Sequence, residues 1–209
     1  FEMPVYKLYY FPLRALGELM RQIFAYAGVD YEDIRVDEEK EWPAFKLQTP
    51  FGQMPVLEVD GKQIPQSFAI ARYLAKQYGM AGATPFEAAW VDALADQYKD
   101  YYGEFRKFWY VLMEFVPGDK DATFEESAKP ARDAFYPILV KALKDAGSGF
   151  LVGSSVTWVD FLISDHIATV KAELPCFLDA YPELITHVER VQALPAIAAW
   201  IARRPVSRV

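Results

Sequence analysis

A polar pair, Gln66-Ser67, stands directly before an apolar helical pattern that ends at Gly79. The first N–H groups of a helix have no partner inside the helix, and the helix dipole places partial positive charge at the same end. Ser67 therefore marks a place where an anionic group such as a carboxylate could bind. The serine hydroxyl could also cap the helix, and we expect that role as well.

Two prolines enclose the hairpin that precedes this pair. Pro55 opens the strand pattern "PVLEV", Pro65 closes the next one, and Asp60-Gly61 between them is a turn signal. Proline cannot donate to a sheet ladder, so it is found at strand starts, edges and bulges. On this pattern alone we expect an ordinary trans proline at the start of a strand.

Other reactive side chains are few. Cys176 is the single cysteine, and His166 and His187 lie far apart without the spacing of metal ligands. Thr157 and Asp160 have the spacing of a helix capping box, which we assign to folding. We therefore expect no bound metal, no internal disulfide and no cysteine nucleophile.

The composition limits the partners of this 209-residue chain. Hydrophobic residues make up 53% of it, so a sizeable core is expected. The net charge of -7 and the absence of a basic run argue against nucleic acid and anionic membranes as partners. No apolar run approaches the roughly 18 residues that span a bilayer. A single cysteine fits a reducing compartment, so we expect a cytoplasmic location.

Strand and helix patterns alternate up to Gly79, and the glycine-rich stretch 79–84 then interrupts them. The predicted order is β-α-β-α-β-β-α, which favours a parallel pair followed by an antiparallel hairpin. The expected elements are a strand at 5–11, a helix at 17–28, a strand at 31–36, a short helix at 42–47, a hairpin at 55–66 and a helix at 67–79. Beyond the break only helical patterns follow, at 85–115, 124–146, 157–172, 182–192 and 195–203. The fold class is α/β plus all-α, with domains at 3–79 and 85–209.

Several motifs together resemble one family. The stretch "FGQMPVLEVDG" followed by "QSFAIARYLAKQYG" resembles the glutathione-binding half of cytosolic glutathione transferases, and "SVTWVDF" resembles their folding signature. "YKLYYF", "WPAFK" and "VQALPAIAAWIARRP" most closely resemble the sigma class and related nematode enzymes. The resemblance extends over almost the whole chain from Met3. It implies a thioredoxin-like domain that binds glutathione and a helical bundle domain that carries a hydrophobic substrate site.

The resemblance implies contacts to glutathione along the hairpin. In the family the bond matching Met54-Pro55 is cis, and this turn of the backbone exposes the N–H and C=O of Met54. The cysteinyl backbone of glutathione can then pair with these groups in the way that an added β-strand would. Gln66 and Ser67 match residues that bind the γ-glutamyl group. The glycyl end and the peptide are assigned to Trp42, Lys46 and Gln53.

The implied chemistry is attack of the glutathione thiolate on an electrophile. A free thiol has a pKa of about 8.5, so the enzyme must stabilise the thiolate. Tyr10 matches the tyrosine whose hydroxyl donates to the sulfur, with Tyr6 and Tyr9 as rivals, and Arg14 matches an arginine that supports both groups.

The resemblance also implies a homodimer. Asp100 matches an aspartate that reaches the glutathione of the neighbouring subunit, and Phe51 is a candidate for insertion into the partner. Lys99 stands where related enzymes hold an acidic residue of a divalent-metal site, so metal activation is not expected. Glutathione is a co-substrate, and no other cofactor is implied.

The electrophile site is assigned to Phe11, Leu13, Phe105, Lys107, Phe108, Leu162, His166 and Val209. Lys107 and Leu162 replace aromatic residues of the prostaglandin D synthases, so we expect a tolerant pocket that accepts many hydrophobic electrophiles. For His166, an ordinary polar helix position is the alternative.

Three functions agree with these motifs. The first is a glutathione transferase that acts in detoxification, with glutathione-dependent peroxidase or isomerase side activity and binding of apolar ligands or haem. The second is a non-catalytic carrier of haem or lipids, and the third is a structural protein like the lens crystallins. Tyr10, Gln66 and Ser67 favour the enzyme.

Overall fold

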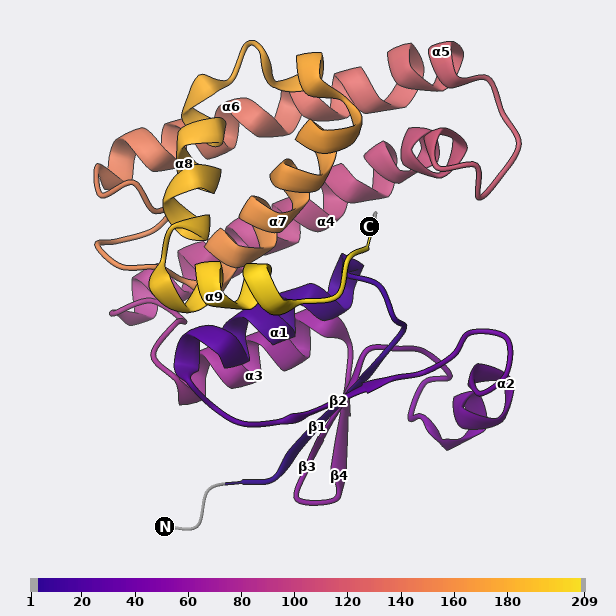
Figure 1. Ribbon diagram of the computed structural model, residues 1–209. Helices are drawn as coiled ribbons and strands as arrows, with labels where there is room; N and C mark the ends of the chain where they lie inside the picture. Colours follow the sequence, from indigo (N-terminus) through magenta and orange to yellow (C-terminus); the bar gives the residue numbers. More distant parts are fainter. Residues whose placement is uncertain (1–3, 208–209) are drawn as a thin grey trace.

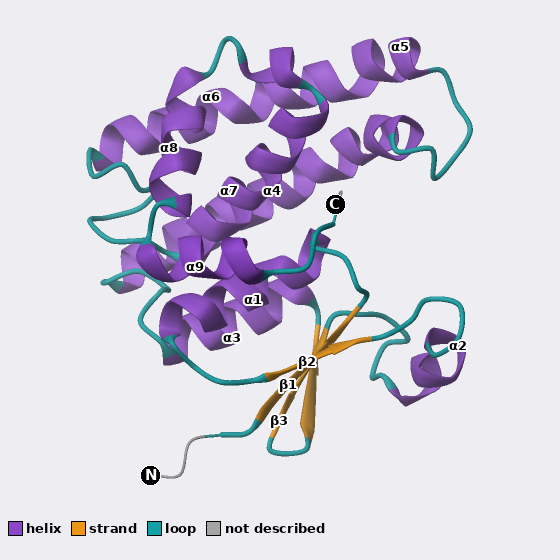
Figure 2. Ribbon diagram, in the orientation of Figure 1, coloured by secondary structure: helices purple, strands orange, loops and turns teal. Residues whose placement is uncertain are grey.

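The computed structural model describes residues 4–207 of the chain, so Val209 lies outside the described residues. A small sheet lies at one end of the molecule, two helices cover it, and the remaining long helices form a second layer above them (Figure 1). Figure 2 shows that all strands belong to the first part of the chain. The predicted fold class, a thioredoxin-like half followed by a helical half, is confirmed.

The N-terminal half has the predicted order of elements. It consists of β1 (Tyr6–Tyr10), α1 (Ala15–Ala27), β2 (Glu32–Arg35), α2 (Trp42–Phe45), β3 (Val56–Val59), β4 (Lys62–Pro65) and α3 (Ser67–Gln77). The sheet order is β2-β1-β3-β4, with β1 and β2 parallel and the other pairs antiparallel. Asp60 and Gly61 both have positive φ, as a two-residue hairpin turn requires. Tyr9 lies opposite Val56, so β1 ends at the sheet edge where β3 begins.

The C-terminal half contains only helices among the described residues. They are α4 (Pro85–Leu112), α5 (Lys120–Thr123), α6 (Lys129–Ala146), α7 (Trp158–Glu173), α8 (Pro182–Gln192) and α9 (Pro195–Arg203). The bounds predicted for α8 and α9 are confirmed. No helix between residues 4 and 207 is long and apolar enough to cross a membrane.

Two predicted helix bounds are wrong. The helix expected to run to Phe115 ends at Leu112, and Glu114 then takes a left-handed conformation in the turn that follows. The helix expected from Phe124 begins earlier, because the Asp119 side chain accepts hydrogen bonds from the first N–H groups of α5. A π-helical turn at Phe124–Ala128 joins α5 to α6. A short 3-10 helix at Pro175–Leu178 was not predicted from the sequence.

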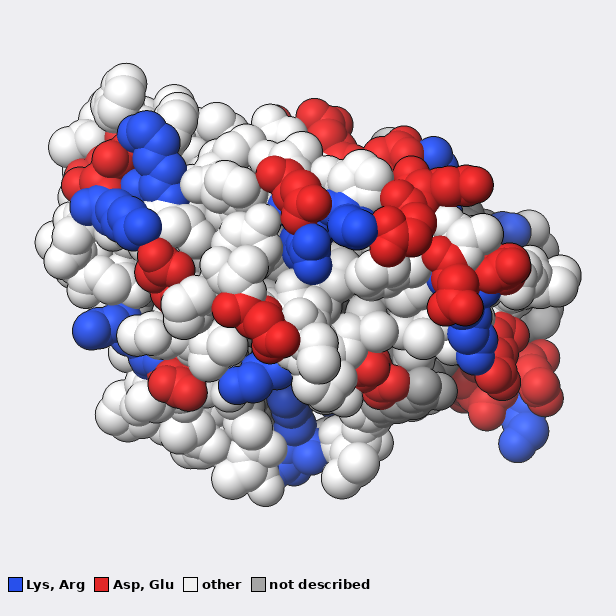
Figure 3. Space-filling model, turned by 90° about the horizontal axis from the view of Figure 1, so that it is seen from above, with Lys and Arg blue, Asp and Glu red and all other residues white. Residues whose placement is uncertain are grey.

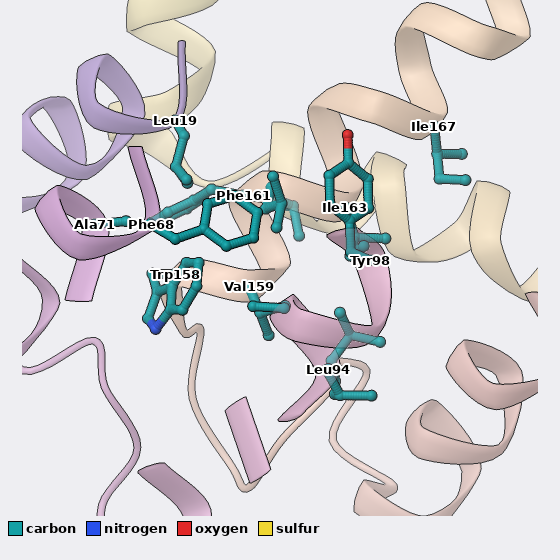
Figure 4. Packing of buried hydrophobic residues seen from close by; sticks show 14 of the residues in the cluster. Leu19, Phe68, Ala71, Leu94, Tyr98, Trp158, Val159, Phe161, Ile163 and Ile167 are labelled. Carbon is teal, nitrogen blue, oxygen red and sulfur yellow. The ribbon is translucent and has the colours of Figure 1, made fainter. Parts of the chain in front are cut away.

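One hydrophobic core joins the two halves. Phe68 of α3 lies between Tyr98 of α4 and Trp158 of α7, with ring centroids 6.3 and 5.6 Å away (Figure 4). Leu19 of α1 and Phe161 of α7 belong to the same cluster. The sheet with its helices is thus fixed against α4 and α7, which is what a site between the two halves requires.

Asp160 holds the start of α7. Its buried carboxylate accepts hydrogen bonds from the N–H and hydroxyl of Thr157 (2.7 and 2.8 Å) and from the N–H of Leu151 (2.8 Å). The Nε2 atom of buried His187 lies 2.9 Å from the same carboxylate. The predicted folding role of the Thr157–Asp160 pair therefore extends to the preceding loop and to α8.

The substitution Asp160→Ala should destabilise the protein by about 3–5 kcal/mol, because it leaves several buried polar groups without a partner. The free energy of unfolding can be measured by urea titration. Asp145→Ala, which removes an exposed carboxylate of α6, is the control and should change little. Equal unfolding curves for the two variants would contradict the assigned role.

Candidate functional site

A hollow beside the sheet edge gathers residues from separate elements. It is lined by Phe11, Leu16, Glu38, Trp42, Lys46, Gly52, Gln53, Met54, Pro55, Gln66 and Ser67. Seven of these are residues that the sequence assigned to glutathione, brought together from α2, the loop before β3 and the start of α3. Tyr10 and Asp100 are not part of this lining.

The loop before β3 places Met54 at the sheet edge. The Met54-Pro55 bond is cis, which confirms the prediction from the family resemblance. The trans bond expected from the pattern alone is wrong. Since β3 starts at Val56 and β1 ends at Tyr10, Met54 lies at the same edge of the sheet as the end of β1.

The start of α3 differs in detail from the prediction. Ser67 is the first helical residue, and Gln66 occupies the N-cap position without a side-chain capping bond, so the expected capping by Ser67 is wrong. Gln66 instead donates from its amide to the side-chain oxygen of Gln53 (3.2 Å). Its φ of 74° is rare for a residue other than glycine, and such backbone strain is often found at functional sites. The helix N-terminus opens to the hollow, where an anion could bind.

The α2 segment supplies an aromatic wall and a cation. The Trp42 ring meets the ring of Phe11 edge-on at 5.6 Å between centroids. Lys46 packs its stem near Gly52, where an added Cβ would lie 3.5 Å from the lysine Cε. Its ammonium group has no ion-pair partner in the part of the chain that the structure describes, so it can meet a carboxylate of a ligand.

Tyr10 ends β1 with its ring packed against α1. Burial raises the pKa of Tyr10 to about 12, although the backbone N–H of Leu16 and the charge of Arg21 oppose the rise. The hydroxyl therefore stays protonated at neutral pH and can donate a hydrogen bond. A Cβ added to Gly17 would lie 2.3 Å from a ring carbon of Tyr10, so only glycine leaves room for the ring there.

The two rival tyrosines are engaged elsewhere. Tyr6 lies in the core, and its hydroxyl receives a hydrogen bond from Tyr78 (2.9 Å). Tyr9 points to the other face of the sheet, where its hydroxyl donates to Glu58 (3.3 Å). Both rival hydroxyls are therefore engaged away from the hollow, and the role of Tyr10 as the donor stays a prediction.

A second hollow adjoins the first. It lies between the start of α1, α4 and α7, and is lined by Ala15, Leu16, Tyr98, Tyr102, Trp109, Leu162, Asp165, His166, Thr169 and Val170. Leu16 lines both hollows, so they meet at the start of α1. Burial raises the pKa of Tyr102 to about 12, and the nearby Tyr110 and Tyr10 add smaller contributions. Tyr10 lies close to the junction because the backbone N–H of Leu16 bonds to it.

Only part of the predicted electrophile site lines this second hollow. Leu162 and His166 do, whereas Phe11 lines the first hollow and Phe105 and Phe108 are buried in the core. The carbonyl group of Leu13 accepts from Arg21, and this residue lines neither hollow.

Lys107 is exposed and pairs with Glu104 (2.5 Å) instead of lining the hollow. At about 100° per residue, Lys107 lies roughly 140° around α4 from Tyr102, whereas Trp109 lies within about 20° of it. Tyr98, Tyr102 and Trp109 were not among the predicted residues, although this helical period could have grouped them.

His166 is held neutral in the wall of the second hollow. Its Nδ1 lies 3.3 Å from the Tyr98 hydroxyl, and its Nε2 lies 2.9 Å from the Tyr101 hydroxyl. Burial lowers the pKa of His166 to about 3, so it supplies polar contacts to these tyrosines without a charge. Its position is therefore more than that of an ordinary polar helix residue.

The remaining predicted residue, Asp100, is exposed on α4 and lines neither hollow. Its contact with a neighbouring subunit stays a prediction. Among residues 4–207, no group of three or more His, Cys, Asp or Glu side chains gathers in a way that could hold a metal ion.

Comparison with known proteins adds to this geometry. The family model "Glutathione S-transferase, N-terminal domain" matches residues 4–76, and "Glutathione S-transferase, C-terminal domain" matches residues 104–204. "Glutathione S-transferase 1" of Ascaris suum is 50% identical over 97% of this chain and 98% of its own. "Probable glutathione S-transferase 5" of Caenorhabditis elegans is 51% identical over 98% and 99%. "Hematopoietic prostaglandin D synthase" of Gallus gallus is 43% identical over 99% and 100%.

Solved structures agree along the whole chain. A nematode-specific transferase of C. elegans superposes with a TM-score of 0.95 at 50% identity, covering 98% of this chain and 99% of the other. A monomeric transferase of Necator americanus superposes with a TM-score of 0.94 at 45% identity, covering 98% and 100%.

His166 should make the free energy of unfolding depend on pH. Its folded pKa lies below its ordinary value, so the stability it contributes is present above pH 6.5 and is lost as the pH falls towards 3. At about pH 4.5 the loss relative to pH 7.5 should be about 3 kcal/mol greater for the wild type than for His166→Asn. Urea titrations of both proteins at the two pH values measure this difference, and parallel losses would contradict it.

Proposed function

The chain belongs to the glutathione S-transferase family, and from that premise we propose that it joins the thiolate of reduced glutathione to hydrophobic electrophiles. One observation carries the proposal: seven residues assigned to glutathione from the family resemblance line a single hollow that meets the second, partly aromatic hollow at Leu16, whose backbone N–H bonds to Tyr10. The assignment of the residues within these hollows is part of the same proposal.

Glutathione fits the first hollow by its charges. The γ-glutamyl carboxylate would lie at the N-terminus of α3, beside Gln66 and Ser67. The glycyl carboxylate would lie near Lys46, with Trp42 and Gln53 along the peptide, and the cysteinyl backbone would pair with Met54. This placement directs the sulfur towards the junction of the two hollows, where Tyr10 ends β1.

Tyr10 would stabilise the sulfur as a thiolate. Its protonated hydroxyl can donate a hydrogen bond to the anion, and lowering the thiol pKa by about two units takes roughly 2.7 kcal/mol. The thiolate then attacks the electrophilic carbon, an S–C bond forms, and the leaving group departs with its bonding electrons, or the electrons of an attacked double bond shift to a neighbouring atom. Arg14 adds a positive charge at the same turn.

The second hollow supports a broad class of hydrophobic electrophiles. Tyr102, Trp109, Leu162 and Val170 provide apolar and aromatic wall, which binds flat or branched apolar groups. Lys107 lies away from this wall, so its side chain does not shape the pocket. The proposed tolerance for different electrophiles therefore depends on Leu162. A glutathione-dependent isomerase side activity agrees with the similarity to the avian prostaglandin D synthase, and peroxidase activity and binding of haem or other apolar ligands remain part of the proposal. We find no feature that favours a non-catalytic carrier.

The finer assignments are a sigma-like class, a role in detoxification, a cytoplasmic location, no cofactor besides glutathione, and a homodimer. In the dimer, exposed Phe51, Phe86 and Trp90 would meet a second copy, and Asp100 would reach its glutathione. The monomeric hookworm relative shows that the fold does not require a partner, so the dimer needs its own test.

Removal of the Tyr10 hydroxyl tests the mechanism. Tyr10→Phe should lower kcat with an aromatic halide by a factor that corresponds to about 2.7–4 kcal/mol at most, because one donor to a developing or full charge is lost. KM for glutathione should stay within about twofold, since the peptide is held elsewhere. Tyr9→Phe is the matched control and should keep full activity. An unchanged kcat in Tyr10→Phe would refute the assignment.

Sedimentation velocity at micromolar concentration tests the dimer. We expect the mass of two chains for the wild type and of one chain for Phe51→Glu, because a buried charge in place of an inserted ring is costly. Phe115→Glu, at an equally exposed ring beyond the end of α4, should stay dimeric. A fully active wild-type monomer would contradict the homodimer.

A further inference from the structure

A chain of charged contacts connects the end of the protein to the start of α1. Glu18 of α1 is buried, and its Oε1 accepts hydrogen bonds from Nε1 of Trp200 and Nη1 of Arg204, both at 2.7 Å. Trp200 belongs to α9, and Arg204 follows it in the segment that passes over the start of α1 (Figure 1). Nearly two hundred residues of sequence separate the partners, so the fold alone brings them together.

The same Arg204 nitrogen reaches a second carboxylate. Nη1 of Arg204 lies 3.4 Å from Oδ1 of Asp165 on α7, and Nη1 of Arg14 lies 3.3 Å from that same oxygen. Asp165 thus contacts Arg14, from the turn before α1, and Arg204, from the segment after α9. Arg204 also contacts Glu18, so it bridges the carboxylates of Glu18 and Asp165. Asp165 also lines the second hollow, so this network lies at the wall of the proposed electrophile site.

We infer that Asp165, fixed by the bridge from Arg204 to Glu18, is a positioning residue that holds Arg14 beside the site of the sulfur. The inference rests on the proposed function, because it gives Arg14 its role towards the thiolate. By this inference, residues of α7 and of the segment after α9 also determine how stable the thiolate is.

Asp165 is charged at neutral pH and can therefore form an ion pair with Arg14. Burial and the charge of Glu18 raise the pKa of Asp165 to about 6, while Arg14 and Arg204 oppose the rise, so the group is mainly ionised at pH 7. The other titratable groups that face it are Tyr98 of α4 and the neighbouring His166, and both are uncharged at that pH. In this low-dielectric setting, the two arginines are the cations that the carboxylate can orient.

The turn that carries Arg14 has a strained backbone. Ala15, the next residue, has a φ of 34°, a strained value for a residue with a Cβ. A strained turn persists only where its surroundings fix it. The pair of Arg14 with Asp165 is one such restraint, since it fastens the turn to α7.

The substitution Asp165→Asn distinguishes positioning of Arg14 from a simple effect of the removed charge, because the two predict opposite changes in the pKa of the bound thiol. Removal of a negative charge near the sulfur would by itself stabilise the thiolate and lower the thiol pKa. Loss of the hold on Arg14 should instead raise the pKa of bound glutathione by about half a unit to one unit. The ultraviolet absorbance of the thiolate, titrated on the complex of protein and glutathione, measures this pKa directly.

The acid limb of the pH profile of kcat/KM should move by the same amount, while KM for glutathione stays within about twofold. Asp179→Asn, an exposed aspartate without an ion pair in residues 4–207, is the matched control and should leave the thiol pKa unchanged. A folded Asp165→Asn protein with an unchanged or lowered thiol pKa would overturn the inference.

Arg204 provides the second series. Arg204→Gln should raise the thiol pKa in the same direction, and Arg204→Lys should restore it, because a single nitrogen of Arg204 makes the contacts to both carboxylates. If Asp165→Asn does not fold, an unchanged thiol pKa in folded Arg204→Gln overturns the inference. A wild-type protein without a thiolate band would instead refute the proposed function itself, and the inference with it.

Discussion

The turn after β1 depends on one buried cation. The guanidinium group of Arg21 is fully buried, and it donates to the carbonyl oxygens of Leu13 (2.6 Å) and Phe11 (3.4 Å) and to the carboxylate of Asp33 (3.1 Å). A buried charge without partners is strongly destabilising, so the turn must keep its carbonyl groups directed at Arg21. That constraint fixes the end of β1 and the start of α1. Leu16, at the start of α1, is the residue that lines both hollows.

On the face seen in Figure 3, acidic side chains gather over the right-hand part, with a few basic side chains among them, and both signs are exposed to solvent. The network around Glu18, Asp165 and the arginines is different, because it is enclosed between α1, α7 and the chain that follows α9. Enclosed ion pairs are screened little by salt, whereas exposed pairs lose most of their strength. The site's electrostatics are therefore set by the interior.

The sequence predicted the elements because those signals are local, whereas the residues of the first hollow were assigned from the family resemblance. Asp60-Gly61, the proline before Val56 and the helical periods from Pro182 onward each depend on neighbours within a few residues. The second hollow was predicted poorly, since its members come from α1, α4 and α7 and meet only in the packed fold. Lys107 was assigned from family position, yet the turn of α4 carries it to the solvent side. The contact of Glu18 with Arg204 leaves no local pattern at all.

Leu16 is the one described side chain that lines both hollows. Most of the remaining wall of the second hollow lies on α4 and α7, away from the residues around the hairpin and α3. Copies of such a gene can therefore exchange wall residues one at a time while the peptide-binding half stays intact. A mutant library confined to Tyr102, Trp109, Leu162 and Val170 would explore new acceptors at little risk to the nucleophile, whereas changes at Leu16 would disturb both.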